Sequence, residues 1–104
     1  MSNVLIVNKG CHDYSKAAEF GDLYFMTEGQ IGRFSTGEMY RRFSPYIKES
    51  KPDDLILVSG LPIMTTVACS MFAAKHGKVN LLLHNSGPGV REHYVQRTIN
   101  MEGL

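Results

Sequence analysis

The chain has 104 residues, an apolar fraction of 43% and a net charge of +1. This length fits one domain over residues 1–104 with no room for a second, and the composition excludes a disordered chain. The positive residues are not concentrated into a basic patch. Binding to duplex nucleic acid is therefore not expected, whereas a small anionic ligand needs only local positive potential.

The two cysteines, Cys11 and Cys69, are too few for a disulfide scaffold and have no neighbours at metal-ligand spacing. Free thiols are typical of a reducing compartment. The N-terminal residues lack the basic and apolar regions of a signal peptide, and no apolar run approaches the roughly 20 residues that span a bilayer. We expect a cytoplasmic protein with no metal site, no cofactor and no membrane partner.

Apolar runs predict the strands, which are Val4–Val7, Leu23–Met26, Leu55–Val58 and Val79–Leu83. Continuous runs of this kind are typical of strands that are buried on both faces of a parallel sheet. A fifth run, Tyr94–Met101, alternates between apolar and polar residues. The link before it is too short for a crossover helix, so we expect this strand to be antiparallel to the fourth.

Three helices are expected between the strands. The first covers residues 14–20, with Asp13 as its cap and Gly21 as its stop. The second begins at Ser35–Glu38, where the serine and the glutamate fit a capping box. Pro45 lies inside this second pattern and is expected to kink the helix or restart it.

The third predicted helix covers residues 63–76, with Pro62 in its first turn and Gly77 as its stop. Its apolar residues surround most of the circumference, which indicates burial on more than one side. In so small a domain this pattern predicts a partner subunit, and hence a homo-oligomer. His76, near the end of the helix, is expected to be a cation that favours the helix dipole.

The alternation of strands and helices predicts an α/β fold, a small open doubly wound sheet of the Rossmann or flavodoxin-like kind. About five strands are expected, mostly parallel, in the order 2-1-3-4-5 with the last strand antiparallel at an edge. In such a sheet, ligands bind beyond the carboxyl ends of the strands where the strand order reverses, here between the first and third strands.

Polar and glycine residues gather after these strands, in residues 8–13 and 59–62, flanked by the loops after the second and fourth strands. The turn before the third helix favours a phosphate, because backbone N–H groups and the helix dipole meet there. The predicted ligand-binding residues are Asn8, Lys9, Gly10, His12, Asp13, Tyr14, Thr27, Glu28, Arg33, Ser59, Gly60, His84 and Asn85.

Each group of candidates has an expected role and a structural alternative. Lys9 adds charge, and Arg33 lies in a long loop that would fold over a bound anion. The histidines and asparagines suit a ribose or a base edge, and Tyr14 or Phe34 would stack on a base. A glycine after a strand, such as Gly60, is also ordinary turn chemistry. Neither loop matches a phosphate-binding P-loop or a dinucleotide fingerprint.

No catalytic residue is assigned, although an enzyme remains an alternative. His12, His84 and Asp13 would suit acid–base cleavage of a phosphodiester if they gather in one pocket. Cys11 and His12 are adjacent, and the side chains of adjacent residues usually diverge. Ser59 lacks the glycine pattern of a nucleophile elbow. Binding without catalysis is the favoured hypothesis.

The sequence resembles a group of small phage-encoded α/β proteins. The resemblance lies in Val4–Ser15, with its Asn-Lys-Gly-Cys-His-Asp-Tyr-Ser run, in Phe20–Leu23, in Thr27–Gly29, in Lys75–Leu82 and in Tyr94–Ile99. Small oligomeric phage proteins of this general kind include some that sequester nucleotide immune signals, such as cyclic ADP-ribose isomers and cyclic oligonucleotides. The resemblance implies a host-cell cytoplasm and an anti-defence role. The alternatives are a phosphodiesterase that degrades such a signal and a structural homo-oligomerisation module.

Overall fold

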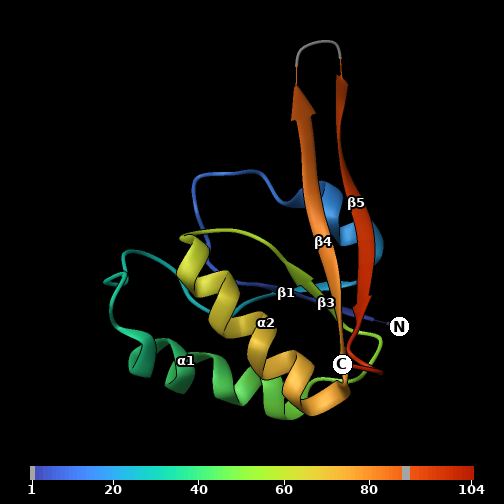
Figure 1. Cartoon of the computed structure of the whole chain (residues 1–104). Helices are drawn as coiled ribbons and strands as arrows, with labels where there is room; N and C mark the ends of the chain where they lie inside the picture. Colours follow the sequence, from blue (N-terminus) through green and yellow to red (C-terminus); the bar gives the residue numbers. More distant parts are fainter. Residues whose placement is uncertain (1, 88–89) are drawn as a thin grey trace.

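The structure is a computed structural model that describes residues 2–87 and 90–104, without the side chains of residues 86, 87 and 90–92. Strands and helices alternate along the first three quarters of the chain, and a long hairpin follows (Figure 1). The elements are β1 (Asn3–Ile6), the 3-10 helix η1 (Ser15–Phe20), β2 (Asp22–Phe25), α1 (Thr36–Glu49), β3 (Leu55–Leu57), α2 (Pro62–His76), β4 (Lys78–Gly87) and β5 (Val90–Asn100).

The described strands form one sheet in the order β2-β1-β3-β4-β5. β1 is parallel to both β2 and β3, β3 is parallel to β4, and β5 is antiparallel to β4. The predicted α/β class, strand order and reversed last strand are therefore confirmed. The strand order reverses at β1, because β2 and β3 both follow β1 in the chain but lie on opposite sides of it in the sheet.

The core lies on both faces of the sheet because side chains alternate along each strand. Leu5 and Val7 of the β1 segment pack with the helix residues Met39, Phe43 and Phe72. On the other face, a second cluster joins the sheet to η1; it contains Val4, Ile6, Tyr14, Ala17, Leu55, Leu57 and Leu82. Figure 1 shows α1 and α2 together on one side of the sheet and η1 on the other. Among the described residues, no helix has the length and apolar character that crossing a membrane requires.

The first two helices differ in detail from the prediction. The first is a 3-10 helix, and Asp13 lies just before it, with Oδ1 accepting the N–H of Ser15 at 2.9 Å. Ser35 is the N-cap of α1, but the predicted capping box is wrong, because Ser35 makes no side-chain capping bond. Its ψ of 55° is outside the extended region that aims a capping hydroxyl at the first turn. Glu38 instead pairs with Arg42, 3.8 Å away. A further difference is that α1 runs through Pro45 without a restart.

The C-termini of α1 and α2 are joined by polar contacts. Lys75 Nζ donates to the carbonyl oxygens of Ile47 and Ser50, each at 3.0 Å. Ser50 Oγ donates to Ile47 O at 2.6 Å and lies 2.8 Å from His76 Nε2, so the single hydroxyl proton leaves His76 as the donor. Burial, and then the charge of Lys75, lowers the pKa of His76. The predicted helix-terminal cation is therefore wrong: the fold favours the neutral imidazole.

The hairpin of β4 and β5 is longer than predicted. Its pairing extends from Lys78 opposite Asn100 to Gly87 opposite Val90, whereas β3 pairs only with Leu81 and Leu82. The two strands satisfy each other's backbone groups, so polar residues continue the ladder beyond the apolar run. Figure 1 shows the hairpin projecting well past the other strands. Residues 88 and 89 of the predicted loop lie outside the described residues.

Candidate functional site

A pocket of about 340 Å³ lies beyond the carboxyl ends of β1 and β3, where the strand order reverses. We call it the switch-point pocket. Its walls come from the loop after β1, the loop after β3 and the projecting hairpin. The lining residues are Asn8, Gly10, His12, Asp13, Tyr14, Leu57, Val58, Ser59, Gly60, His84 and Tyr94. The structure therefore brings eight of the predicted residues together: Asn8, Gly10, His12, Asp13, Tyr14, Ser59, Gly60 and His84.

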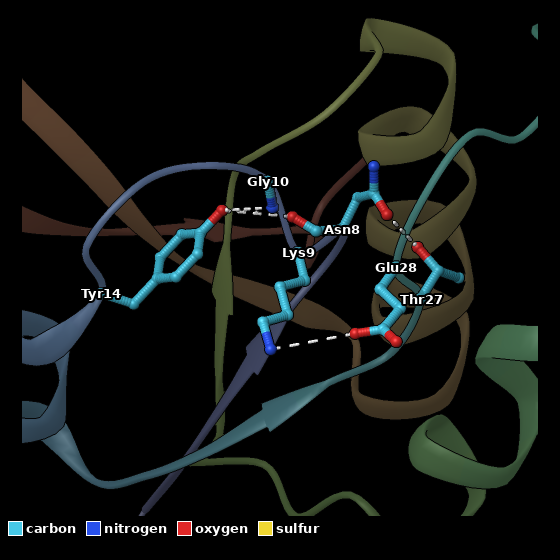
Figure 2. Close-up of polar contacts among 6 residues, drawn as sticks. All are labelled: Asn8, Lys9, Gly10, Tyr14, Thr27 and Glu28. Carbon is cyan, nitrogen blue, oxygen red and sulfur yellow. Dashed lines mark hydrogen bonds and ion pairs between the residues drawn. The ribbon is translucent and has the colours of Figure 1, made fainter.

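Tyr14 holds the loop after β1 in place. Its hydroxyl accepts the N–H of Gly10 at 3.0 Å and donates to the carbonyl oxygen of Asn8 at 3.4 Å (Figure 2). The ring is buried and meets Phe25 edge-on, with the centroids 5.5 Å apart. The hydroxyl therefore fixes the path of the loop, and burial of the ring limits its predicted use as a stacking surface for a base.

Asn8 joins three loops. Its N–H donates to Ser59 Oγ at 3.2 Å, and Ser59 Oγ donates back to its carbonyl oxygen at 3.0 Å. Its side-chain Nδ2 donates to Gly29 O at 3.2 Å, and Oδ1 accepts from Thr27 Oγ1 at 2.9 Å. Asn8 therefore fixes the positions of the loops after β2 and β3 relative to β1.

Thr27, Lys9 and Glu28 lie outside the pocket lining. Thr27 is buried, and its one hydroxyl proton is shared between the carbonyl oxygen of Val7, at 2.7 Å, and Asn8 Oδ1, so it helps to hold the Asn8 side chain. Lys9 Nζ lies 3.9 Å from the Glu28 carboxylate and 5.1 Å from the centre of the Phe25 ring. Figure 2 shows this pair on the β2 side of the loop. A parallel backbone bridge also pairs Lys9 with Glu28, and it continues the register of β1 with β2 beyond the ends of these strands.

Arg33 and Asn85 are also absent from the lining. The Arg33 guanidinium lies 5.2 Å from the centre of the Phe34 ring, in the loop before α1. The Asn85 amide lies 3.4 Å from His93 Nε2, across the hairpin. Conversely, Tyr94 lines the pocket but was not among the residues predicted from the sequence. The hairpin register places it opposite His84, a relation that the two separate strand patterns do not contain.

A series of rings crosses the pocket from one wall to the other. The His12 centroid lies 6.2 Å from that of Tyr14 and 6.5 Å from that of His84, and the His84 centroid lies 5.2 Å from that of Tyr94. His12 and His84 are both exposed. The lining contains no lysine or arginine, so histidine is its one source of cationic charge among the described residues.

Asp13 adds a carboxylate to the same pocket. Hydrogen bonds from the backbone and then the side chain of Ser15 lower the pKa of Asp13. These bonds favour its ionised form, which accepts hydrogen bonds and has no proton to donate. Within residues 2–87 and 90–104, no three histidine, cysteine, aspartate or glutamate side chains gather as a metal site.

Gly60 joins the pocket to the start of α2. Its φ of 80° lies in the left-handed region, and a Cβ there would come within 2.9 Å of Asn8 Cβ. Glycine is thus required by the backbone and by the approach of Asn8. Leu61, the N-cap of α2, makes no side-chain cap bond. In the first turn of α2, Pro62 has no N–H, and the N–H groups of Met64 and Thr65 donate to the carbonyl oxygen of Leu61.

Comparison with known proteins identifies a family for this chain. No curated protein and no solved structure matches the chain. The sequence model of one family, described as phage Pam3 gp32-like protein, matches residues 4–101. The matched segment begins in β1 and ends beyond β5, so it contains all of the sheet except Asn3 and all of the residues that line the switch-point pocket. The chain therefore belongs to the phage Pam3 gp32-like protein family.

Proposed function

We propose that the switch-point pocket binds a small phosphorylated nucleotide, and that this phage protein sequesters a nucleotide immune signal in the cytoplasm of its host. The signal would be of the cyclic ADP-ribose or cyclic nucleotide type. The observation that carries the proposal is the pair His12 and His84, 6.5 Å apart between ring centroids, in a pocket at the strand-order reversal. Pockets at this place in α/β sheets take ligands.

The chemistry of the walls supports a nucleotide over an apolar ligand. Imidazoles donate hydrogen bonds to phosphate or ribose oxygens, and the helix dipole at the start of α2 favours an anion. Gly60 has no side chain of its own, so it contributes only backbone to the pocket lining, beside Asn8. Tyr94, beside His84, offers an aromatic surface for a base. Together these groups match the three parts of a nucleotide.

Sequestration is favoured over cleavage because of Asp13. A phosphodiesterase needs a group that protonates the leaving oxygen. Asp13 is held as a carboxylate by Ser15, so it is a poor donor for that step. Cleavage remains the second candidate, because His12, His84 and Asp13 all line one pocket. Two histidines alone can serve as base and acid, and this arrangement has to be tested directly.

The test is isothermal calorimetry of the full chain against cyclic ADP-ribose isomers, cyclic dinucleotides and linear mononucleotides. We expect at least one of these to bind with a micromolar or tighter Kd. The bound ligand is then released by heat and identified by mass spectrometry. Intact ligand supports sequestration, and a hydrolysed product supports the phosphodiesterase. Absence of binding across the panel would reject the nucleotide proposal.

A further inference from the structure

We infer that the ligand is a dinucleotide, two nucleoside units joined through phosphate, because a second compartment adjoins the switch-point pocket and shares two of its lining residues. This inference rests on the proposed nucleotide function and names the ligand class. The second compartment has a volume of about 630 Å³ and lies between the loop after β2 and the start of α2. It is lined by Asn8, Gly29, Gln30, Ile31, Gly32, Gly60, Leu61 and Met64.

The two compartments meet at Asn8 and Gly60, which line both of them. These two residues are in close contact, since a Cβ on Gly60 would lie 2.9 Å from Asn8 Cβ. Asn8 and Gly60 together form the partition between the two compartments. Gly60 contributes only backbone atoms to this partition, because it has no side chain. A ligand that enters both compartments crosses this partition, and a slender phosphate link crosses it more easily than a sugar or a base.

The second compartment has walls suited to a base. Ile31 and Met64 are buried, and Leu61 is 40% exposed, so its apolar walls come from the loop after β2 and from the start of α2. Gln30 adds one exposed amide that can donate to and accept from the edge of a base. The switch-point pocket has the histidines and Tyr94 instead. Each compartment therefore offers its own surface for a nucleoside unit.

Volume favours two units over one. Sites for small molecules typically measure about 300–1,000 Å³. Each compartment falls within this range by itself, at about 340 Å³ and about 630 Å³. A mononucleotide would fill only one compartment. It would leave either the apolar walls of the second compartment or the histidines of the switch-point pocket without contact to the ligand. A dinucleotide would use both sets of groups.

The hydrogen bonds of Asn8 keep the two compartments in one arrangement. Its backbone is bonded to Ser59 on the switch-point side, and its amide is bonded to Gly29 on the side of the second compartment. The partition is therefore held from both sides before a ligand arrives. Such preorganisation reduces the entropy that a two-part ligand loses on binding.

The experiment compares mononucleotides with dinucleotides on three forms of the full chain. The probes are AMP and GMP, and cyclic di-AMP, cyclic di-GMP and linear ApA and GpG. The forms are the wild type, Leu61→Trp, which places an indole in the second compartment, and Leu104→Trp. Leu104 is fully exposed and outside both linings, so it controls for the same substitution elsewhere. Calorimetry gives each Kd, and thermal melting confirms folding.

We expect a dinucleotide to bind the wild type at least tenfold more tightly than the matching mononucleotide. Leu61→Trp should reduce this advantage to less than twofold, and Leu104→Trp should preserve it. Mononucleotides that bind as tightly as dinucleotides would overturn the inference and leave the proposed function standing. An advantage unchanged by Leu61→Trp would also overturn it. Absence of binding to all of these probes would overturn the inference, and the calorimetry with cyclic ADP-ribose isomers would then decide the proposed function. If Leu61→Trp does not fold, Gln30→Ala, at an exposed position in the same lining, takes its place with the same expectations.

Discussion

The rings of His12 and His84 lie 6.5 Å apart, although one belongs to the loop after β1 and the other to the β4–β5 hairpin. The hairpin brings the second histidine across the sheet because β4 continues past the end of β3. The pocket is therefore closed by an element that projects beyond the rest of the fold. Its ligand affinity should depend on two segments that are distant in sequence.

Replacing either histidine by alanine should weaken nucleotide binding without unfolding the domain. Both side chains are exposed, so we expect the free energy of unfolding to change by no more than about 0.5 kcal/mol. Loss of one hydrogen bond to a charged phosphate corresponds to about a tenfold rise in Kd. Calorimetry and urea unfolding measure the two effects. His93→Ala, on the hairpin but outside the lining, is the control. Unchanged affinity in both variants would place the site elsewhere.

The sheet could be predicted because its central strands are apolar on both faces. Residues 4–7 and 55–58 contribute side chains to both core clusters, which leaves a parallel arrangement as the natural one. The place of the pocket followed from the strand order alone. A lining residue could be predicted only where its position in a loop after β1 or β3 is enough to place it beside the pocket, as for His12 and Ser59.

Side-chain direction and long-range register could not be predicted. Lys9 was expected in the pocket, but its ammonium group lies beside the Glu28 carboxylate and over the Phe25 ring. Tyr94 was missed because its place depends on its pairing with His84, a contact set by hairpin register. Similarly, the capping box at Ser35 fits the sequence pattern, but the backbone angles of Ser35 rule it out. Each of these differences depends on a backbone or side-chain torsion angle, or on the register between two strands, and the order of residues in the sequence does not reveal either.

Gly60→Ala should destabilise the fold more than Gly77→Ala. Both glycines have φ near +75°, at 80° and 72°, so an alanine at either position is strained by roughly 1–2 kcal/mol. At Gly60 the new Cβ would also come within 2.9 Å of Asn8 Cβ, whereas nothing lies within 4 Å of it at Gly77. The difference between the two variants in urea unfolding therefore measures the contact with Asn8. Equal destabilisation would mean that the loops shift apart at no cost.

Gly60→Ala should change ligand binding as well as folding. A loss of ligand binding in Gly60→Ala would combine strain, movement of Asn8 and obstruction of the pocket. The histidine variants separate binding from folding more cleanly, because their side chains support no part of the core. We therefore expect Gly60→Ala to lower both the melting temperature and the affinity.

His76 should make the domain less stable in mildly acidic solution. Burial lowers the pKa of His76 in the folded chain below its value of about 6.5 in the unfolded chain. The unfolded state then binds more protons between these two pKa values, so stability is complete above about pH 6.5 and falls as the pH drops below it. His76→Gln keeps a donor for Ser50 and has no titrating group.

The measurement is the urea midpoint of the wild type and of His76→Gln at pH 7.5 and pH 5. Carboxylates titrate in both proteins, so the difference between their pH dependences isolates His76. We expect the wild type to lose more stability than the variant on acidification. An identical loss would show that the imidazole is protonated in the fold without penalty, and that its bond to Ser50 survives protonation.

Asn8→Asp should destabilise the domain and weaken binding in both compartments. The substitution keeps the shape of the side chain but replaces the Nδ2 donor, 3.2 Å from Gly29 O, by a carboxylate oxygen. Two acceptors then face each other, which costs about 1–3 kcal/mol of unfolding free energy. The added negative charge lies beside both compartments and opposes a phosphate at their partition. Urea unfolding and calorimetry measure the two losses.

Asn100→Asp is the matched control, because the Asn100 side chain is exposed and its Oδ1 accepts from Glu102 N, a role that a carboxylate retains. We expect its stability to stay within about 0.5 kcal/mol of the wild type. Acidification should partly restore Asn8→Asp, since a protonated carboxyl can again donate to the Gly29 carbonyl. If Asn8→Asp were as stable as Asn100→Asp at neutral pH, the amide contact with Gly29 would not hold the loop after β2. The second compartment would then lack a fixed wall, and the two-part site would lose the preorganisation on which its affinity depends.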